Sequence, residues 1–409
     1  MNDSRSSFRI ANATLVLPDR LVPDGAVDVS GGRIAAAGRA DHLPPASGTI
    51  VDAGGAFVAP GFVDLHVHGG DGADFMDGTL EAFERVIRAH TRHGTTTIVP
   101  TSTVARHDQT IAFLEHTRTM QARGAAPGEG LARTIGAHFY GPYFAEEKVG
   151  CHPREAVRPP TRHEFEQYLD YAGVLLVATC APELPGAAEF YRAASARGVR
   201  LNAGHSNATW TEMQAAFDLG VRHVDHFYCA MSSVGSLRER CGTPMQASMT
   251  EFVLGTDEMT TEVIADGRHL APELLRFVVR AKGVERTALV TDCSRALDRP
   301  PGTYIFGPLD GGETFYNDGE VGLLPGSPDL ASSVRGMDFM VRHMHQQVGL
   351  SLPAAIRMAS LTPAAILGVQ DDIGSLEPGK RADLVFLDAG LRTRRVFVGG
   401  EEVRIRPAA

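Results

Sequence analysis

Cysteine is scarce in this sequence, and its arrangement excludes two common kinds of scaffold. The five cysteines are odd in number and include no Cys-x-x-Cys pair. A disulfide framework uses an even set and a zinc knuckle uses closely spaced pairs, so the sequence indicates neither. We expect reduced thiols at all five positions, which are Cys151, Cys180, Cys229, Cys241 and Cys293.

Long apolar runs and basic blocks are absent as well. No segment reaches the ~20 apolar residues of a membrane span, and the polar start MNDSRSSFRI lacks the apolar core of a signal peptide. The formal net charge of −10 argues against nucleic acid or an anionic membrane as a partner. These features predict a cytoplasmic protein, and they leave room for a local site that binds an anionic small molecule.

Both ends of the chain have the texture of a small β domain. Residues 8–58 consist of short valine-rich pieces separated by turn-forming residues, and the stretch after residue 373 alternates apolar and polar residues behind the turn EPGK. We therefore expect a small β-sandwich domain built from both termini, covering residues 1–58 and 370–409. Residues 59–369 form the larger domain.

Strand and helix patterns alternate through that larger domain. A helix is predicted from Thr79 to His93, followed by the β-branched strand GTTTIVPT, and another helix over 209–219 opens with the capping box of Thr209 and Glu212. Strand candidates with helical stretches between most of them continue over about 300 residues. This alternation predicts an α/β fold with a (β/α)₈ TIM-like barrel.

The stretch GFVDLHVHGG, residues 61–70, ends an apolar strand with two histidines one residue apart. Side chains alternate along a strand, so His66 and His68 point to the same side. A single histidine there is most simply explained by a hydrogen bond to the backbone. For a pair at the carboxyl end of a strand, we favour metal binding.

Other polar residues recur where the predicted strands end: His138, His205, His226, His269 and Asp292. In a (β/α)₈ barrel these ends meet at one mouth. Imidazole and carboxylate ligands suit Zn²⁺ or Fe²⁺, which make a bound water acidic enough to attack a carbonyl group. Asp292 would take the proton of that water and pass it to a leaving amine. Taken singly, Asp292 could instead cap a helix, and His223 and His226 could be ordinary loop histidines.

Further motifs run from one end of the chain to the other: APGFVDLHVHGGDGADFMDG, GTTTIVPT, GPYFAEEKVGCHP, LNAGHSNAT, DHFYCAM, IADGRH, LVTDCS, MASLTPAAILG and GSLEPGKRADLV. The order GHSNAT then IADGRH is the specific signal. In these motifs the chain resembles the amidohydrolase superfamily and, within it, the N-acetylglucosamine-6-phosphate deacetylases. The resemblance implies a metal-dependent hydrolase barrel over 59–369 that removes acetate from an N-acetyl amino sugar phosphate, and it implies a homodimer.

The resemblance also implies roles for individual residues. His66, His68, His205, His226 and Asp292 match metal ligands, and Asp292 is also the catalytic acid/base. His269 matches a histidine that helps to polarise the substrate carbonyl. The implied substrate contacts are His152, Cys229, Ala230, Arg238, His269 and Leu324, with Arg238 as the phosphate ligand and Cys229-Ala230 where the family usually has Asn-Ala.

One position departs from the family. Where the family reads HLEGP, with the glutamate as a metal ligand, this chain reads HFYGP and has Tyr140. A neutral phenol, with a pKa near 10, is a much poorer ligand than a carboxylate. We therefore expect one metal ion per chain, Zn²⁺ or alternatively Fe²⁺, unless Glu146 or Glu147 supplies the missing carboxylate.

Three functions follow from this pattern. The first is deacetylation of an N-acetylhexosamine 6-phosphate. The second is a related hydrolase or deaminase, whose substrate differs because Tyr140 and Cys229 reshape the mouth. The third is a sugar-phosphate sensor that kept the fold and lost catalysis, which the retained Asp292 and four histidines disfavour. The sequence does not specify the sugar epimer, the acyl group or the phosphorylation of the substrate.

Overall fold

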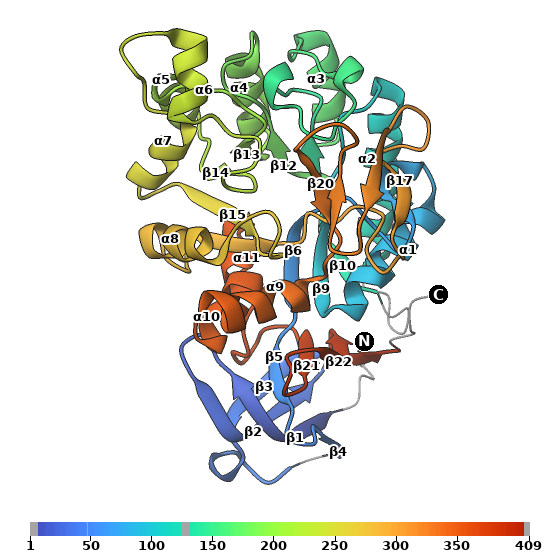
Figure 1. Cartoon of the computed structure of the whole chain (residues 1–409). Coiled ribbons are helices and arrows are strands. Elements are labelled where there is room, and N and C mark those ends of the chain that lie inside the picture. Colours follow the sequence, from blue (N-terminus) through green and yellow to red (C-terminus); the bar gives the residue numbers. More distant parts are fainter. Residues whose placement is uncertain (1–6, 47, 125–130, 405–409) are drawn as a thin grey trace.

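The computed structural model describes residues 7–46, 48–124 and 131–404. Two parts are distinct in Figure 1: a barrel-like body of strands and helices, and a sheet at the end of the molecule where the early strands lie. Within the described residues, no helix is both long and apolar enough to cross a lipid bilayer.

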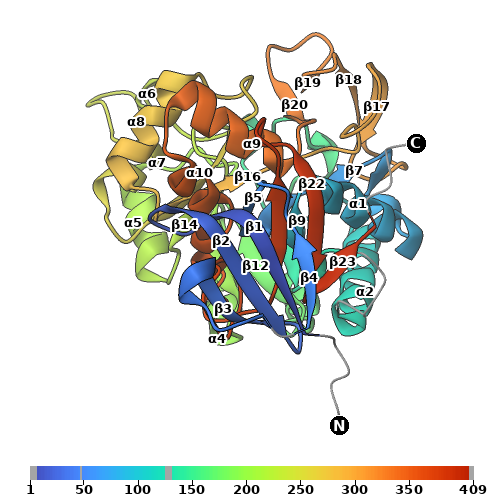
Figure 2. The ribbon, with the colours of Figure 1, turned by 90° about the horizontal axis from the view of Figure 1, so that it is seen from below.

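The terminal sheet is built from both ends of the chain, as expected. Its order is β23 (Glu401–Val403), β22 (Thr393–Val398), β21 (Leu384–Leu387), β5 (Phe57–Pro60), β1 (Phe8–Val16), β2 (Leu21–Ser30) and β3 (Arg33–Arg39), with β4 (Thr49–Asp52) beside the start of β1. These strands are hydrogen-bonded into one sheet, which lies in front of the barrel in Figure 2. Alternate residues such as Ile10, Leu384 and Phe386 build its separate apolar core.

Eight parallel strands of the described chain curl into the barrel. They are β6 (Phe62–Val67), β9 (Thr95–Pro100), β11 (Ala137–Tyr140), β12 (Leu175–Thr179), β13 (Arg200–Ala203), β14 (His223–Val224), β15 (Thr260–Ile264) and β16 (Thr287–Val290). A bridge between Thr101 and His138 joins the second strand to the third. The Asp292 amide donates to the His66 carbonyl oxygen at 2.9 Å and joins the last strand to the first. The expected barrel is therefore confirmed.

The expected strand RTIGAHF is broken in two. β10 (Arg133–Thr134) pairs with β9, whereas β11 pairs with β12, and Gly136 between them has a positive φ of 158°. Arg133 also ties the two parts of the molecule together, because its Nη1 lies 2.9 Å from Asp383 of the terminal sheet domain. Both side chains are buried.

Helices cover the outside of the barrel. They are α1 (Leu80–Arg92), α2 (His107–Arg123), α3 (Arg162–Leu169), α4 (Ala187–Ala196), α5 (Trp210–Asp218), α6 (Val234–Cys241), α7 (Met249–Gly255), α8 (Pro272–Lys282), α9 (Met337–His343), α10 (Leu352–Ala359) and α11 (Leu361–Ile366). Two of them were predicted from the sequence, α5 together with its capping box. Thr79 caps α1 by accepting from the Ala82 amide, and Thr209 and Glu212 form the capping box of α5.

A small antiparallel sheet was not predicted. Strands β17 (Gly302–Phe306), β18 (Glu313–Asn317), β19 (Val321–Leu323) and β20 (Leu330–Ser333) follow β16, where a helix would continue the barrel pattern. A short hairpin follows β6, and each of its two strands, β7 (Gly69–Gly70) and β8 (Ala73–Asp74), has two residues. The alternation of GTYIF and ETFYN around Asp-Gly-Gly is a hairpin signal that was overlooked.

Candidate metal centre

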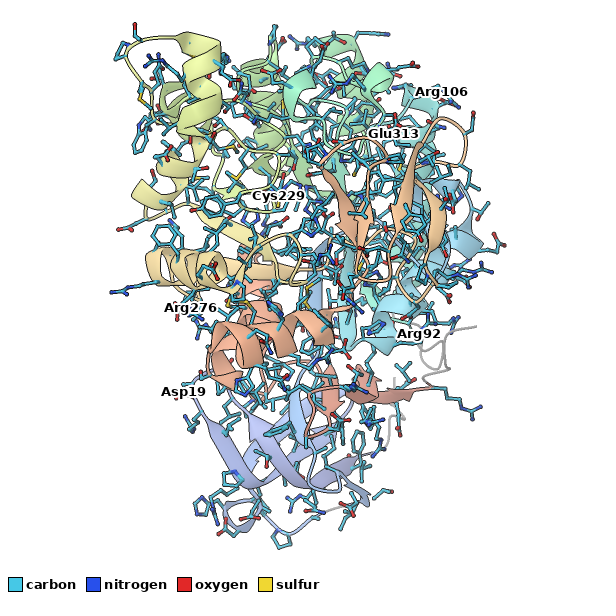
Figure 3. The ribbon with its side chains drawn as sticks, viewed as in Figure 1. Asp19, Arg92, Arg106, Cys229, Arg276 and Glu313 are labelled. Atoms are coloured by element: carbon cyan, nitrogen blue, oxygen red, sulfur yellow. The ribbon has the colours of Figure 1, made fainter. Side chains whose placement is uncertain are left out.

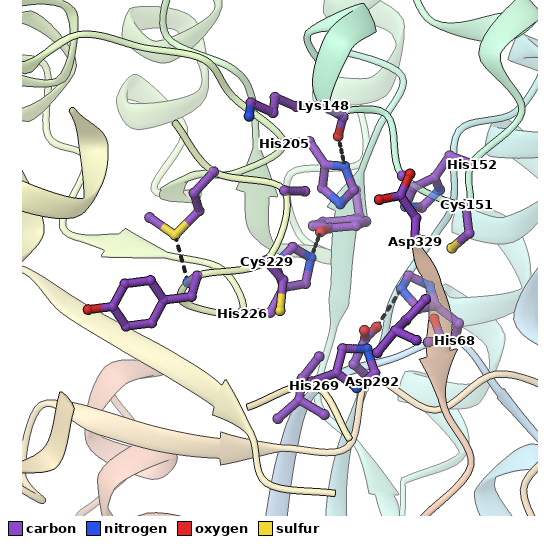
Figure 4. Close-up of a pocket in the computed structure, with 18 of the residues that line it drawn as sticks. His68, Lys148, Cys151, His152, His205, His226, Cys229, His269, Asp292 and Asp329 are labelled. Atoms are coloured by element: carbon purple, nitrogen blue, oxygen red, sulfur yellow. Dashed lines mark hydrogen bonds and ion pairs between the residues drawn. The ribbon is translucent and has the colours of Figure 1, made fainter. Parts of the chain in front are cut away.

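A cavity of about 450 Å³ opens at the carboxyl ends of the barrel strands. Figure 4 shows its histidines converging with Asp292. Of the residues predicted from the sequence, the structure places these along its wall: His68, His152, His205, His226, Cys229, Ala230, His269 and Asp292. The alternative role of Asp292 as a helix cap does not apply, because the chain after it leads to β17.

Three residues with a predicted metal or substrate role lie elsewhere. His66 is completely buried beneath the cavity wall. Arg238 lies exposed on α6, outside the residues that line the cavity. Leu324 packs against a small apolar cluster around Phe306 and Phe315, and its amide donates to the carbonyl oxygen of Asp329 at 3.3 Å. Asp329 itself lines the cavity, so Leu324 stands one layer behind the wall.

His66, His68 and Asp292 form one of two groups of candidate metal ligands among the described residues. One ligand atom from each lies within 4.8 Å of the others, and all three side chains are buried. Asp292 Oδ1 is 3.2 Å from His68 Nε2 and 3.7 Å from His66 Nε2. Nε2 of His66 has no hydrogen-bond partner in the described part of the chain. A buried lone pair aimed at a carboxylate fits a divalent cation, because the cation would satisfy both groups.

Glu262 holds His66 in the orientation that this fit requires. The His66 Nδ1–H donates to Glu262 Oε1 at 2.5 Å, so the lone pair of the neutral ring lies on Nε2. Glu262 is completely buried, and it also accepts from His223 Nε2 at 3.2 Å and from the His226 amide at 3.1 Å. This residue is not among those predicted from the sequence, although a carboxylate inside the strand TTEVI was a signal for it.

Asp225 completes a polar layer below the candidate ligands. His66, Asp225 and Glu262 also come within 4.8 Å of one another. However, Asp225 already accepts from Thr179 Oγ1 and Asn202 Nδ2, each at 2.8 Å. His66 Nδ1 is likewise committed to Glu262. These bonds make the second group a supporting network for the His66, His68 and Asp292 set.

Charges in this layer favour a bound cation. Burial lowers the pKa of His66, but the charge and hydrogen bond of Glu262, together with the charges of Asp292 and Asp225, outweigh burial and raise the pKa to about 9. A metal ion at Nε2 would therefore take the place of a proton on this ring. Burial raises the pKa of Asp292. The hydrogen bond from His68 and the charges of the nearby histidines outweigh burial and hold this pKa well below its usual range. A buried carboxylate that stays ionised needs a positive partner, and a divalent metal ion is one.

Tyr140 lies beside His205 and His226, the two other histidines that were predicted to bind metal. Its hydroxyl donates to His226 Nε2 at 2.5 Å, and its ring centroid lies 5.3 Å from that of His205. Burial and the surrounding carboxylates raise the pKa of the phenol well above its usual value, so it is neutral. His226 Nε2 is therefore engaged by a hydroxyl. His205 donates from Nδ1 to the Lys148 carbonyl oxygen at 2.6 Å and keeps its Nε2 lone pair.

The loop carboxylates do not replace the missing glutamate at the candidate ligands. Glu147 lines the cavity, but its Oε1 accepts from Asn207 Nδ2 at 3.2 Å. Glu146 is exposed. Among the described residues, neither joins His205 or His226 in a group with metal-ligand spacing.

His269 and His152 flank the same cavity. His269 donates from Nδ1 to Asp266 at 2.7 Å, which leaves its Nε2 for the cavity. His152 accepts from the Val104 amide at 3.3 Å through Nδ1. Burial, followed by the charges of the neighbouring histidines, lowers the pKa of His152 well below its usual value. His138, in contrast, lies outside the wall and contacts Thr179.

Backbone strain is concentrated at this wall. Five non-glycine residues that line the cavity have a positive φ, namely His205 (44°), Tyr228 (73°), Ala230 (49°), Asp292 (45°) and Ser332 (61°). Such conformations cost of order 1–3 kcal/mol each and persist where the surrounding structure enforces them. Nothing in the residue types signals this feature, so sequence reasoning could not find it.

A parallel barrel with imidazoles and a carboxylate at the carboxyl ends of its strands defines the class of metal-dependent (β/α)-barrel proteins. The model of the amidohydrolase family matches residues 57–403, and the chain belongs to that family. It is 33% identical to the N-acetylgalactosamine-6-phosphate deacetylase of Escherichia coli O157:H7 over 360 residues, which cover 88% of this chain and 91% of the relative. It is 31% identical to the N-acetylglucosamine-6-phosphate deacetylase of Vibrio furnissii, with 84% and 82% covered.

Solved structures agree with this assignment. A point mutant of the N-acetyl-D-glucosamine-6-phosphate deacetylase from Mycobacterium smegmatis, in complex with N-acetyl-D-glucosamine-6-phosphate, superposes with a TM-score of 0.86 at 29% identity. The match covers 97% of this chain and 99% of that one. The N-acetylglucosamine-6-phosphate deacetylase from Pasteurella multocida gives 0.87 at 26% identity, with the same coverage.

We predict that Glu262→Gln weakens metal binding by about 10- to 100-fold, because the amide no longer fixes the His66 tautomer. Competition with a chromophoric chelator measures the affinity. Glu147→Gln is the matched control and should leave the affinity unchanged. Equal affinities in the wild type and Glu262→Gln would show that Glu262 does not support the ligand.

Proposed function

We propose that this protein is a metal-dependent amide hydrolase that removes the N-acetyl group from an N-acetylhexosamine 6-phosphate. The observation that carries the proposal is the buried set of His66, His68 and Asp292 at the mouth of an amidohydrolase barrel. The deacetylases to which the chain is similar over most of its length support the substrate class.

The residues at the mouth have distinct parts in this reaction. A divalent metal ion held by His66, His68 and Asp292 supplies, when bound, the Lewis acidity that activates water and the amide carbonyl. Asp292 accepts a proton from the attacking water and delivers it to the departing amine. His269, fixed by Asp266, directs Nε2 into the cavity and donates a hydrogen bond to the carbonyl oxygen as negative charge develops there.

We infer one metal ion per chain, and Zn²⁺ is the expected ion with Fe²⁺ as the alternative. His205 and His226 would be the remaining ligands of a second ion. Two divalent cations close together repel strongly, and a bridging carboxylate usually offsets that repulsion. Tyr140 provides a neutral hydroxyl at this position, and its bond to His226 supports a single ion.

Substrate binding is assigned to the outer part of the cavity. His152, Cys229 and Ala230 line it, and Ala230 has a positive φ of 49°. Arg238 on α6 is our candidate for the phosphate ligand, and Leu324 supports the wall through Asp329. We also expect the protein to be a cytoplasmic homodimer. Light scattering would measure the mass of the assembly.

Tyr140 and Cys229 favour a second candidate, a related amidohydrolase or deaminase with a different substrate. Both residues line the cavity and depart from the usual family pattern. Acetate release by metal-analysed protein from N-acetylglucosamine 6-phosphate and its galactosamine epimer tests the first function. Release of ammonia, or turnover of another N-acyl amide alone, would support the second.

We predict that Asp292→Asn lowers kcat by about 10²- to 10⁴-fold, because an amide cannot carry the proton. Metal content, measured by mass spectrometry, should stay nearly intact, since the amide keeps one oxygen ligand. Asp329→Asn, on the same cavity wall, is the control and should stay within about twofold of the wild type. If Asp292→Asn keeps more than about a tenth of the wild-type kcat, the assigned role is wrong.

Arg238→Ala should raise KM for the phosphorylated substrate and change little for its unphosphorylated analogue, because a guanidinium that holds phosphate contributes to binding. Steady-state kinetics on the two substrates provide the comparison. Equal effects on both would place the phosphate elsewhere.

Tyr140→Glu should raise the metal content from one ion per chain toward two, because the carboxylate completes a second set with His205 and His226. Metal analysis after dialysis against excess Zn²⁺ gives the count. Tyr140→Phe removes the hydroxyl without adding charge and should stay at one. Two tightly held ions in the wild type would contradict the single-ion site.

A further inference from the structure

A second cavity, of about 360 Å³, lies between His93 after α1, the loop after β16, and α9. Its wall differs in composition from that of the first cavity. Four arginines contribute to it, namely Arg299, Arg335, Arg342 and Arg392. Such a gathering of guanidinium groups is notable in a chain with a net charge of −10.

The carboxylates of this cavity are already paired with other cations. Asp298 lies 2.8 Å from Arg92 Nη2, a residue labelled in Figure 3, and 3.0 Å from His93 Nε2. Asp338 lies 3.0 Å from His93 Nδ1 and accepts from the Thr393 amide at 3.2 Å. The imidazole of His93 therefore bridges both acids, and the charge of Arg342 makes only a smaller contribution to the lowered pKa of Asp338.

Three of these guanidinium groups have no carboxylate at ion-pair distance in the described part of the chain, although Arg342 donates to the Leu391 carbonyl oxygen at 3.5 Å. The guanidinium carbons of Arg335 and Arg342 lie 4.9 and 5.0 Å from the centre of the Phe339 ring, which holds both in place. Within the described residues, no ion pair involves Arg335, Arg342 or the exposed Arg392. The charge of Arg335 helps to lower the pKa of Asp318, but the ion pair that Asp318 forms is with Arg268, at 3.6 Å.

Strand β20 connects this cavity to the candidate metal centre. Leu330 and Ser332 line the first cavity, and Arg335, two residues after the strand, lines the second. The Ser333 amide donates to the Asp292 carbonyl oxygen at 3.0 Å. The Cys293 thiol, next in sequence to Asp292, donates to the Arg335 carbonyl oxygen at 2.9 Å.

We propose that the second cavity binds a phosphate group, free or on a small molecule, and that its occupancy alters the metal centre through β20. A dianion would pair with Arg335 and Arg342 as forked donors, which suits phosphate geometry. Binding would draw Arg335 toward the ligand and shift the hydrogen bonds that hold the strained Asp292 segment. This site is separate from the phosphate position assigned to Arg238, and it stands independently of the proposed reaction.

Calorimetric titration with inorganic phosphate and with glucose 6-phosphate tests the binding. The wild type should show a site that weakens at least about tenfold in Arg335→Gln/Arg342→Gln. The exposed Arg280→Gln on α8 loses the same charge elsewhere and should bind as the wild type does. Each single variant should show part of the loss, which keeps the test valid if the double variant folds poorly. Equal binding by all variants would overturn the site. If glucose 6-phosphate binding is lost in the double variant and inorganic phosphate does not bind the wild type, the ligand of this cavity is a sugar phosphate.

The coupling has its own measurement, which needs no turnover. The rate at which a chelator removes Zn²⁺ should change at least about twofold on adding phosphate to the wild type, and should not change in the double variant. An unchanged rate in the wild type would overturn the coupling. Because neither measurement uses substrate hydrolysis, failure of the proposed deacetylase reaction would appear separately, as an absence of acetate release.

Discussion

The hydrogen bond from the Asp292 amide to the His66 carbonyl oxygen is the constraint on which the candidate site depends. It joins the last strand of the barrel to the first, and so it places residues from opposite ends of the barrel sequence side by side. Only with this closure can His66, His68 and Asp292 share one cation. Glu262 adds a second constraint on His66. The backbone hydrogen bond holds the strand that carries His66, and Glu262 holds the orientation of the His66 ring.

The barrel, and the meeting of the candidate ligands at its strand ends, were predictable for a physical reason. Parallel strands bring their carboxyl ends together, so His68, His205 and Asp292 had to meet once the alternation of strands and helices was recognised. Patterns of residue type do not show which buried groups will hydrogen-bond across the barrel, and Glu262 was therefore missed. Arg238 illustrates a different limit, since a helix can be predicted without predicting which of its side chains face the mouth.

Tyr140 shows how a single substitution alters a shared framework. The ring fits among the histidines, and its hydroxyl satisfies His226 where a charged ligand would otherwise stand. The sequence predicted the loss of a ligand. The structure adds that the ring fills the space and that its hydroxyl engages Nε2 of His226, whereas Nδ1 of His226 is buried with no hydrogen-bond partner among the described residues.

The terminal sheet has a consequence for the order of folding during synthesis. Strand β5 lies in the middle of this sheet, and its neighbour β21 is made more than 300 residues later. Until β21 leaves the ribosome, β5 presents an unpaired edge, which is a template for pairing with other chains. Strands β1 to β5 can pair with one another early, but the outer edge of β5 stays open until nearly the whole chain is made, and a nascent chain truncated before β21 carries an exposed, aggregation-prone edge.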